Sequence, residues 1–305
     1  MSNFFKSGPM IAFYSAILFG FTLVFLDTAS KAVGPFKLIS YYQLAGVALL
    51  FVFSIITKKK LQVKKLIKNN KRELLEIFLL RSMGGSVLYT YGFFLTTAIK
   101  GSFFTRFEAM FVVVMGYLFL KEKISKRDLF AILAMVIGAI VLATGGDFST
   151  LVGINLGDIM IVGGGLLLSY TFVSAKRIKN VDPISITFLT MLLGGTAMLL
   201  LLPILNGSFG IGGLDNALQI LGVTFFTTSG MLLFYKALEK TKAWVVGAIL
   251  SIQTVVAAII SYLFLNQTLT TIQTAGALVV LVMSVYVTYR SAENDAGLKG
   301  KNTQK

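Results

Sequence analysis

Among the charged residues within the long apolar stretches of the sequence, three cations and one deep carboxylate stand out, namely Arg81, Arg106, Lys236 and Glu108. Hydrocarbon disfavours a charged side chain by about 2.5–3.5 kcal/mol on insertion scales, so such a residue is a functional candidate by default. A guanidinium can hold a carboxylate through two parallel hydrogen bonds. Three cations against one deep carboxylate therefore predict a binding site for a small molecule that bears a carboxylate or phosphate.

Each of these charges also has a structural interpretation. Arg81 could snorkel to the membrane interface, or pair with Glu76 or Glu108, and Lys236 lies near a helix end, where a snorkelled side chain is favoured. Burial without a partner would suit Glu108 to carrying a proton, whereas a permanent partner such as Arg106 would leave it structural. The sequence leaves both alternatives open.

Aromatic and amide side chains extend the candidate site. Tyr89, Tyr91 and Tyr235 stand at helical positions from which a ring could stack on a planar substrate, although packing and interfacial belts are the commoner roles of such rings. Gln253 adds polarity to a later apolar stretch. The predicted substrate-binding residues are Arg81, Arg106, Glu108, Tyr89, Tyr91, Gln253, Tyr235 and Lys236.

Cysteine and histidine are both absent from the 305 residues. Their absence excludes a thiolate nucleophile, a cysteine metal site and the commonest general base. No clustered acidic pair lies in a predicted helix, so the residues that a membrane-embedded enzyme would use for acid–base or metal chemistry are nearly absent. We therefore expect no enzyme activity, no cofactor and no metal site, and a passive channel or a scaffold remains as a third class.

The composition requires a lipid environment. Apolar residues make up 56% of the chain and charged residues 13%, against roughly 25% charged in a soluble domain. A spanning helix needs about 20 mostly apolar residues, and this rule predicts an all-α integral membrane protein with ten transmembrane helices. The expected spans are residues 9–29, 36–57, 74–99, 102–120, 129–145, 156–175, 184–205, 217–238, 243–265 and 271–289.

The basic residues predict the orientation. With a cytoplasmic N-terminus, 22 of the 28 Lys and Arg residues fall in cytoplasmic segments and 3 in the opposite loops. Basic residues stay on the cytoplasmic side, so we expect both termini in the cytoplasm and a multi-pass protein of the plasma membrane. The dense run Lys58–Arg72 then sets topology beside the lipid bilayer, and no nucleic-acid partner is expected.

The chain contains a duplication. Tyr117-Leu118-Phe119-Leu120 recurs as Tyr262-Leu263-Phe264-Leu265, 145 residues later, and the same offset pairs Lys31 with Lys176 and Gly85 with Gly230. Five spans in each half would start the second copy on the opposite side of the membrane, which is the inverted-repeat plan of many secondary transporters. The expected repeats are residues 1–148 and 149–290, followed by a polar tail over 291–305.

Three motifs resemble the drug/metabolite transporter superfamily, in particular its EamA-type ten-helix members. They are Arg81-Ser82-Met83-Gly84-Gly85, Phe107-Glu108-Ala109 and the turn Leu118-Phe119-Leu120-Lys121-Glu122-Lys123-Ile124-Ser125. Ala109 stands where the family usually has proline, and Gln267 where glutamate is common. The resemblance covers nearly the whole chain and implies a central cavity lined by helices one, three, four, six, eight and nine. It places helices five and ten at the edge, where a homodimer contact is an open alternative.

These observations predict a secondary transporter that moves a small polar or amphipathic metabolite of the amino-acid or organic-anion type. Alternating access between the inverted halves would carry the substrate, and the resemblance favours an exporter or exchanger. The alternative is a proton-coupled exporter of cationic drugs. A cationic substrate would require unpaired acidic groups, and for this reason it comes second.

Overall fold

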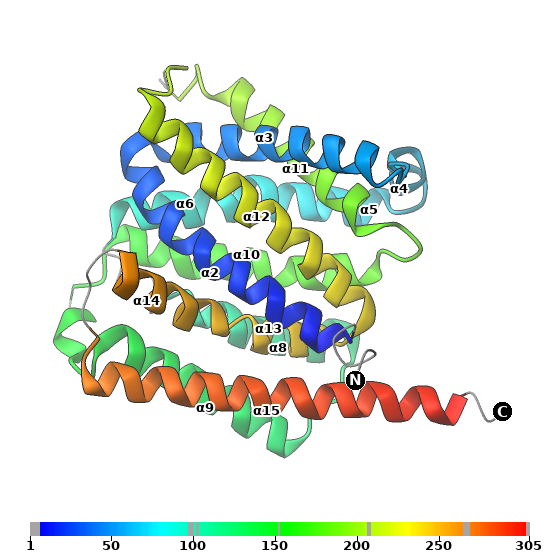
Figure 1. Ribbon diagram of the computed structural model, residues 1–305, viewed down its shortest axis with the longest axis vertical. Coiled ribbons are helices and arrows are strands. Elements are labelled where there is room, and N and C mark those ends of the chain that lie inside the picture. The colour runs from blue at the N-terminus through cyan, green and yellow to red at the C-terminus, as the bar shows by residue number, and fades with distance from the viewer. Residues whose placement is uncertain are drawn as a thin grey trace.

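The computed structural model (Figure 1) describes residues 7–96, 101, 104–151, 153–205, 209–264 and 269–302. Its description of side chains leaves out Arg106, Thr150, Leu151, Phe264 and residues 294–302. Within these ranges every regular element is a helix.

The helices follow the apolar stretches of the sequence. The first half contains α2 (Gly8–Val33), α3 (Pro35–Ile56), α4 (Val63–Asn69), α5 (Lys71–Ile77), the π-helix η1 (Phe78–Gly85), α6 (Ser86–Leu95), α8 (Arg106–Leu120) and α9 (Lys126–Thr144). The second half contains the 3₁₀-helix η2 (Phe148–Leu151), α10 (Leu156–Arg177), α11 (Pro183–Leu201), α12 (Leu214–Lys240), α13 (Ala243–Ile249), α14 (Ile252–Phe264) and α15 (Thr271–Asn302).

The described part of the chain has eight helical spans long and apolar enough to cross a membrane, with α13 and α14 counted as one, and a shorter apolar helix over Phe107–Leu120. The expected span 74–99 falls on α5, η1 and α6, which follow one another without a gap. Only a helix or a closed barrel satisfies its backbone in lipid, so long apolar runs of this kind become helices. The prediction of an all-helical membrane protein is confirmed.

Two expected helices are interrupted in the structure. A turn at Thr105 precedes α8, and residues Leu250 and Ser251 separate α13 from α14. At both places backbone N–H groups reach back three residues instead of four, from Glu108 to Thr105 (3.2 Å) and from Gln253 to Leu250 (3.0 Å). Tighter turns of this kind often mark functional positions. Apolar length alone did not reveal them.

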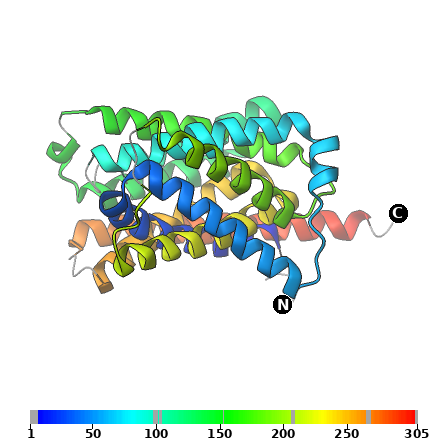
Figure 2. The same cartoon turned by 90° about the horizontal axis from the view of Figure 1, so that it is seen from above.

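The helices pack in matched pairs. α2 runs along α12 while α10 runs along η1 and α6, and α3 packs on α11 (Figures 1 and 2). α9 and α15 form a pair at one edge of the bundle (Figure 1). Glycines allow that pair to approach closely, because a Cβ on Gly276 would lie 2.5 Å from the carbonyl oxygen of Gly138.

The start of α2 and the end of α15 lie on the same side of the bundle, here called the terminal side (Figure 1). Helix α4 and the connection between α10 and α11 lie there too. Hydrogen bonds join the turn after α8 to the start of α13. The Glu122 carboxylate accepts them from the N–H groups of Ala243 (2.9 Å) and Trp244 (3.2 Å). The turn after α8 is thereby fixed to a helix of the second half.

Candidate functional site

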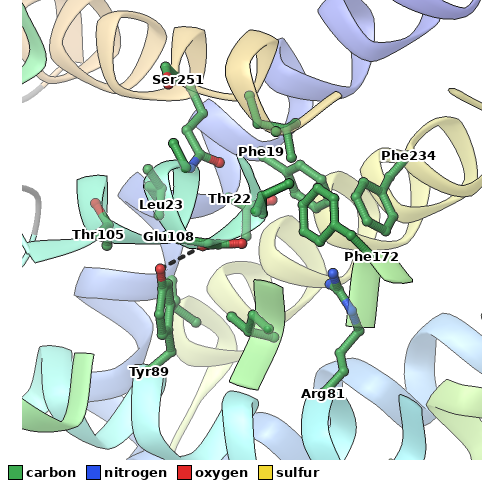
Figure 3. Close-up of a pocket in the computed structure, with 17 residues that line it drawn as sticks. Phe19, Thr22, Leu23, Arg81, Tyr89, Thr105, Glu108, Phe172, Phe234 and Ser251 are labelled. Atoms are coloured by element: carbon green, nitrogen blue, oxygen red, sulfur yellow. Dashed lines mark hydrogen bonds between the residues drawn. The ribbon is translucent and has the colours of Figure 1, made fainter. Parts of the chain in front are cut away.

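A cavity of about 150 Å³ lies in the middle of the bundle, between helices of both halves (Figure 3). Helices α2, η1, α6 and α8 supply one part of its wall, and α10, α12, α13 and α14 supply the rest. Much of the lining is apolar, with Phe19, Phe172 and Phe234 together at one end (Figure 3). A concave, mostly apolar space with a few polar groups is the usual form of a small-molecule site.

The polar groups of the cavity come largely from the two helix interruptions. Thr105 and Glu108 lie at the start of α8, and Ser251 and Gln253 flank the start of α14. Tyr89 of α6 completes this group, because its phenol donates a hydrogen bond of 2.6 Å to Glu108 Oε2 (Figure 3). A carboxylate and several hydroxyls therefore face one region of the space.

Arg81 enters the cavity from the π-helix η1. Its guanidinium carbon lies 4.8 Å from the centre of the Phe234 ring, and its Nε donates to Thr171 Oγ1 at 3.3 Å. Figure 3 shows Arg81 and Glu108 entering the space from different walls. Among the described residues no ion pair involves Arg81. The guanidinium lies against an aromatic face, an arrangement that favours a cation.

The π-helix gives Arg81 its position. Its wider turn is typical of functional sites, and the hydroxyl of Ser86 donates to the Arg81 carbonyl oxygen at 2.8 Å. Gly85 lets η1 sit directly against α10, since a Cβ there would lie 2.7 Å from Leu168 Cδ2. Arg81 is thus fixed where the third and sixth expected spans meet.

A second cavity of about 120 Å³ adjoins the first and shares Phe19, Thr22, Leu26, Arg81, Tyr89 and Leu168 with it. It extends toward α3 and α11, where Tyr42, Gln43 and Met191 form its wall. Arg81 therefore stands at the junction of two compartments.

The structure brings four of the predicted substrate-binding residues together. Arg81, Glu108, Tyr89 and Gln253 all line the first cavity, although they belong to four separate segments of the chain. Glu76, one partner considered for Arg81, instead accepts hydrogen bonds from Arg72 (2.9 Å) and from Ser174.

Three other predicted residues lie outside both cavity linings. Tyr91 is two positions from Tyr89, so it points to a different face of α6 and packs against Phe36. Tyr235 is buried beside Phe234 but is not among the lining residues, and Lys236 is exposed on α12. The side chain of Arg106 lies outside the part of the chain that the structure describes.

Sequence reasoning missed most of the aromatic wall. Phe19, Phe172 and Phe234 look like any other phenylalanine in an apolar stretch, so nothing in their spacing marks them. Gln43 did carry a signal, because an amide within the apolar span 36–57 is unusual there.

Comparison with known proteins agrees with this architecture. The model of the EamA-like transporter family matches two segments of the chain, residues 6–144 and 155–289. The chain belongs to the EamA-like transporter family. As an EamA-like protein it is a multi-pass membrane protein, and the predicted membership of the drug/metabolite transporter superfamily is confirmed.

Relatives of this EamA-like protein are named transporters. An uncharacterized transporter of Methanothermobacter thermautotrophicus is 26% identical over 90% of this chain and 84% of its own. The uncharacterized transporter YyaM of Bacillus subtilis is 22% identical over 86% of this chain and 85% of its own. A protein crystal structure superposes with a TM-score of 0.79 at 12% identity, covering 93% of this chain and 96% of its own, which shows the fold alone.

Proposed function

We propose that this protein is a secondary transporter that moves a small carboxylate-bearing metabolite by alternating access between two inverted five-helix repeats. The observation that carries the proposal is the cavity of Arg81 and Glu108, whose wall comes from both halves of the chain. In alternating access, the substrate binds between two halves that move relative to each other. Access to a site within one half would not change with that movement.

Three observations support the inverted repeats and, with them, ten spans. The family model matches twice, on either side of residues 145–154. The interruption at Thr105 and the one at Leu250 stand 145 residues apart, which is the offset of the sequence repeat. α2 packs along α12 as α10 packs along η1 and α6, so each half presents the same helix to the other. Interrupted helices at matched positions are a known feature of transporter binding sites.

The side chains suggest how a substrate is held. The guanidinium of Arg81 binds the carboxylate of the substrate, and Phe172 and Phe234 cover its apolar part. Glu108, held by the Tyr89 phenol, sits beside the helix interruption at Thr105. Rocking of one half against the other would open this space first to one side of the membrane and then to the other. The basic loops favour a plasma-membrane orientation with cytoplasmic termini.

Glu108 gives a second candidate some support, namely proton-coupled export of a cationic drug. A carboxylate in the wall of an apolar cavity attracts a cation. Arg81 in the same wall opposes a cationic substrate, and for this reason we place the carboxylate-bearing metabolite first.

Transport by purified protein in liposomes tests the proposal. A mixed pool of labelled amino acids, hydroxy acids and cationic dyes would be offered with and without an imposed proton gradient, and accumulated compounds identified. Accumulation of carboxylates that Arg81→Gln abolishes supports the first candidate. Accumulation of dyes that Glu108→Gln abolishes supports the second, and folded protein that moves neither contradicts both.

A further inference from the structure

A buried hydrogen-bond acceptor in the second cavity has no partner within the fold. Gln43 of α3 is 3% exposed, and its Oε1 makes no hydrogen bond. Buried amide oxygens in native proteins nearly always have a donor, because leaving one unpaired is costly. Such an atom in a cavity wall points to a ligand that brings the donor.

The Gln43 side chain lies beside the phenol of Tyr42, but its Oε1 receives no hydrogen bond. Gly194 of α11 makes the room, because a Cβ there would lie 2.2 Å from Gln43 Oε1. The nearby hydroxyls of Ser82 and Ser86 donate elsewhere, to Thr190 O at 3.1 Å and to Arg81 O at 2.8 Å. Both serines line the same cavity.

We propose that Gln43 forms a subsite for a hydroxyl or ammonium group carried close to the substrate carboxylate. Arg81 lines both cavities, so a carboxylate on its guanidinium places the neighbouring part of the ligand beside the Gln43 compartment. The substrate is then a hydroxy acid or an amino acid, in preference to a plain carboxylic acid. This inference rests on the proposed function of the Arg81 cavity.

Three series of acids that share a carbon skeleton test the subsite. They are alanine, lactate and propionate; leucine, 2-hydroxy-4-methylpentanoate and 4-methylpentanoate; and phenylalanine, 3-phenyllactate and 3-phenylpropionate. Binding to the full chain in detergent is measured by calorimetry, and members of a series differ only in the ammonium, hydroxyl or hydrogen next to the carboxylate. Gln43→Met keeps the approximate size of the side chain and removes the acceptor, whereas Gln43→Glu keeps an acceptor oxygen.

In the unmodified chain we expect one series to bind with a preference of about tenfold for the hydroxy or amino member, as one hydrogen bond warrants. Gln43→Met should remove this preference and leave the plain acid unaffected, while Gln43→Glu should retain it. Comparison of the hydroxy with the amino member of that series shows whether the donor to Gln43 is a hydroxyl or an ammonium group. An unchanged preference in Gln43→Met overturns the subsite alone and leaves the Arg81 site standing. No binding in any series overturns both.

A second, independent observation concerns two lysines at matched positions of the repeat. Lys176, near the end of α10, donates from Nζ to the carbonyl oxygens of Leu238 and Thr241 at the end of α12. Lys31, 145 residues earlier near the end of α2, instead pairs with Asp27 one turn back at 2.7 Å. The Lys31 side chain is 48% exposed, and exposed pairs of this kind contribute little stability.

The helix end that corresponds to α12 has the same form. The C-cap residue of α12 is Thr241 (φ −138°, ψ 174°), whose N–H bonds to Ala237 O. The C-cap residue of α6 is Thr96 (φ −114°, ψ 175°), whose N–H bonds to Gly92 O. Carbonyl groups at a helix end attract a cation. The end of α6 therefore presents carbonyl groups to Lys31, as the end of α12 does to Lys176.

We infer that Lys176 and Lys31 are alternating latches of the two sides. In this structure Lys176 closes the terminal side, and in the other state Lys31 leaves Asp27 and closes the opposite side on the end of α6. The inference rests on the proposed alternation but needs no substrate, so a distance measurement tests it separately from transport.

Spin labels measure the two sides. Because the chain has no cysteine, Lys179→Cys with Glu239→Cys reports the terminal side, and Ala32→Cys with Phe94→Cys reports the opposite side; all four positions are exposed or near-exposed. Lys176→Met should lengthen the distance between positions 179 and 239 and shorten the distance between positions 32 and 94. The share of molecules with these changed distances should be at least tenfold larger than in the labelled chain that keeps Lys176. Lys176→Arg should keep the present distances, and adding Lys31→Met to Lys176→Met should abolish the shortened one.

Lys236→Met, which removes an exposed cation from α12, serves as the control and should leave both distances unchanged. Unchanged distances in Lys176→Met would make that lysine a static cap. A shortened Ala32–Phe94 distance that survives loss of Lys31 would overturn its role as the second latch.

Discussion

The phenol of Tyr89 donates a hydrogen bond of 2.6 Å to the carboxylate of Glu108 in the wall of the central cavity. The two residues belong to different helices, α6 and α8. A hydrogen bond to an ionised acceptor helps a carboxylate to remain in an apolar wall. In the proposed function, Glu108 is the carboxylate that takes up and releases a proton.

Glu108→Gln should therefore remove gradient-driven uptake while leaving exchange of substrate across the membrane intact. The amide keeps the size of the side chain but carries no proton to release. Uptake into liposomes with and without a proton gradient measures the difference, with Tyr89→Phe as a milder variant that keeps the carboxylate. Gradient-driven uptake that persists in Glu108→Gln would return this residue to a structural role.

Arg81→Gln should weaken carboxylate binding by about ten- to a hundredfold, because it removes charge-assisted hydrogen bonds that contribute about 1.5–3 kcal/mol. Arg81→Lys should recover part of the loss, since an ammonium keeps the charge but not the planar fork. Phe234→Leu is the matched control, because it keeps Arg81 but removes the aromatic ring beside its guanidinium. Calorimetry on detergent-purified protein gives the affinities, and equal binding in all variants would contradict the assignment.

Glu122→Ala should lower the free energy of unfolding by about 0.5–2 kcal/mol, the usual cost of losing a helix cap. The carboxylate accepts two N–H groups at the start of α13, at 2.9 Å and 3.2 Å. Glu122→Gln keeps acceptor capacity and should lose less. Thermal unfolding in detergent measures both variants, and an alanine variant as stable as the parent would show that water replaces the cap.

Gly276→Ala should destabilise the pair of α9 and α15 by about 1–3 kcal/mol, as overpacking usually does. A Cβ there would lie 2.5 Å from Gly138 O and 2.6 Å from Leu142 N, both backbone atoms that cannot swing aside. Gly163→Ala is the control, because its Cβ would meet only Leu88 Cδ1 at 3.8 Å. Equal melting temperatures for the two variants would contradict the packing.

Single cysteines should report the orientation, since the chain has none of its own. Lys60→Cys in the basic loop should resist a membrane-impermeant maleimide in intact cells, and Ser149→Cys, in η2 after α9, should react. Both positions are exposed, so access to the reagent depends on the side of the membrane. The reverse pattern would place the termini outside.

The sequence by itself determined the class of this protein and the first members of its site. Apolar runs of about 20 residues specify membrane helices wherever they occur, because each backbone group must find its partner within the segment. Arg81 and Glu108 stood out for a similarly local reason, since a charge within such a run is costly. Their family motifs carried the same information.

Only the tertiary structure decided which faces of the helices meet. These helices are apolar on all sides, so no periodicity separates Phe234, which lines the cavity, from Tyr235, which does not. The unpaired amide of Gln43 and the cap that Lys176 places on α12 each depend on residues far away in the sequence. Such contacts arise from packing between helices, and a pattern within one helix does not contain them.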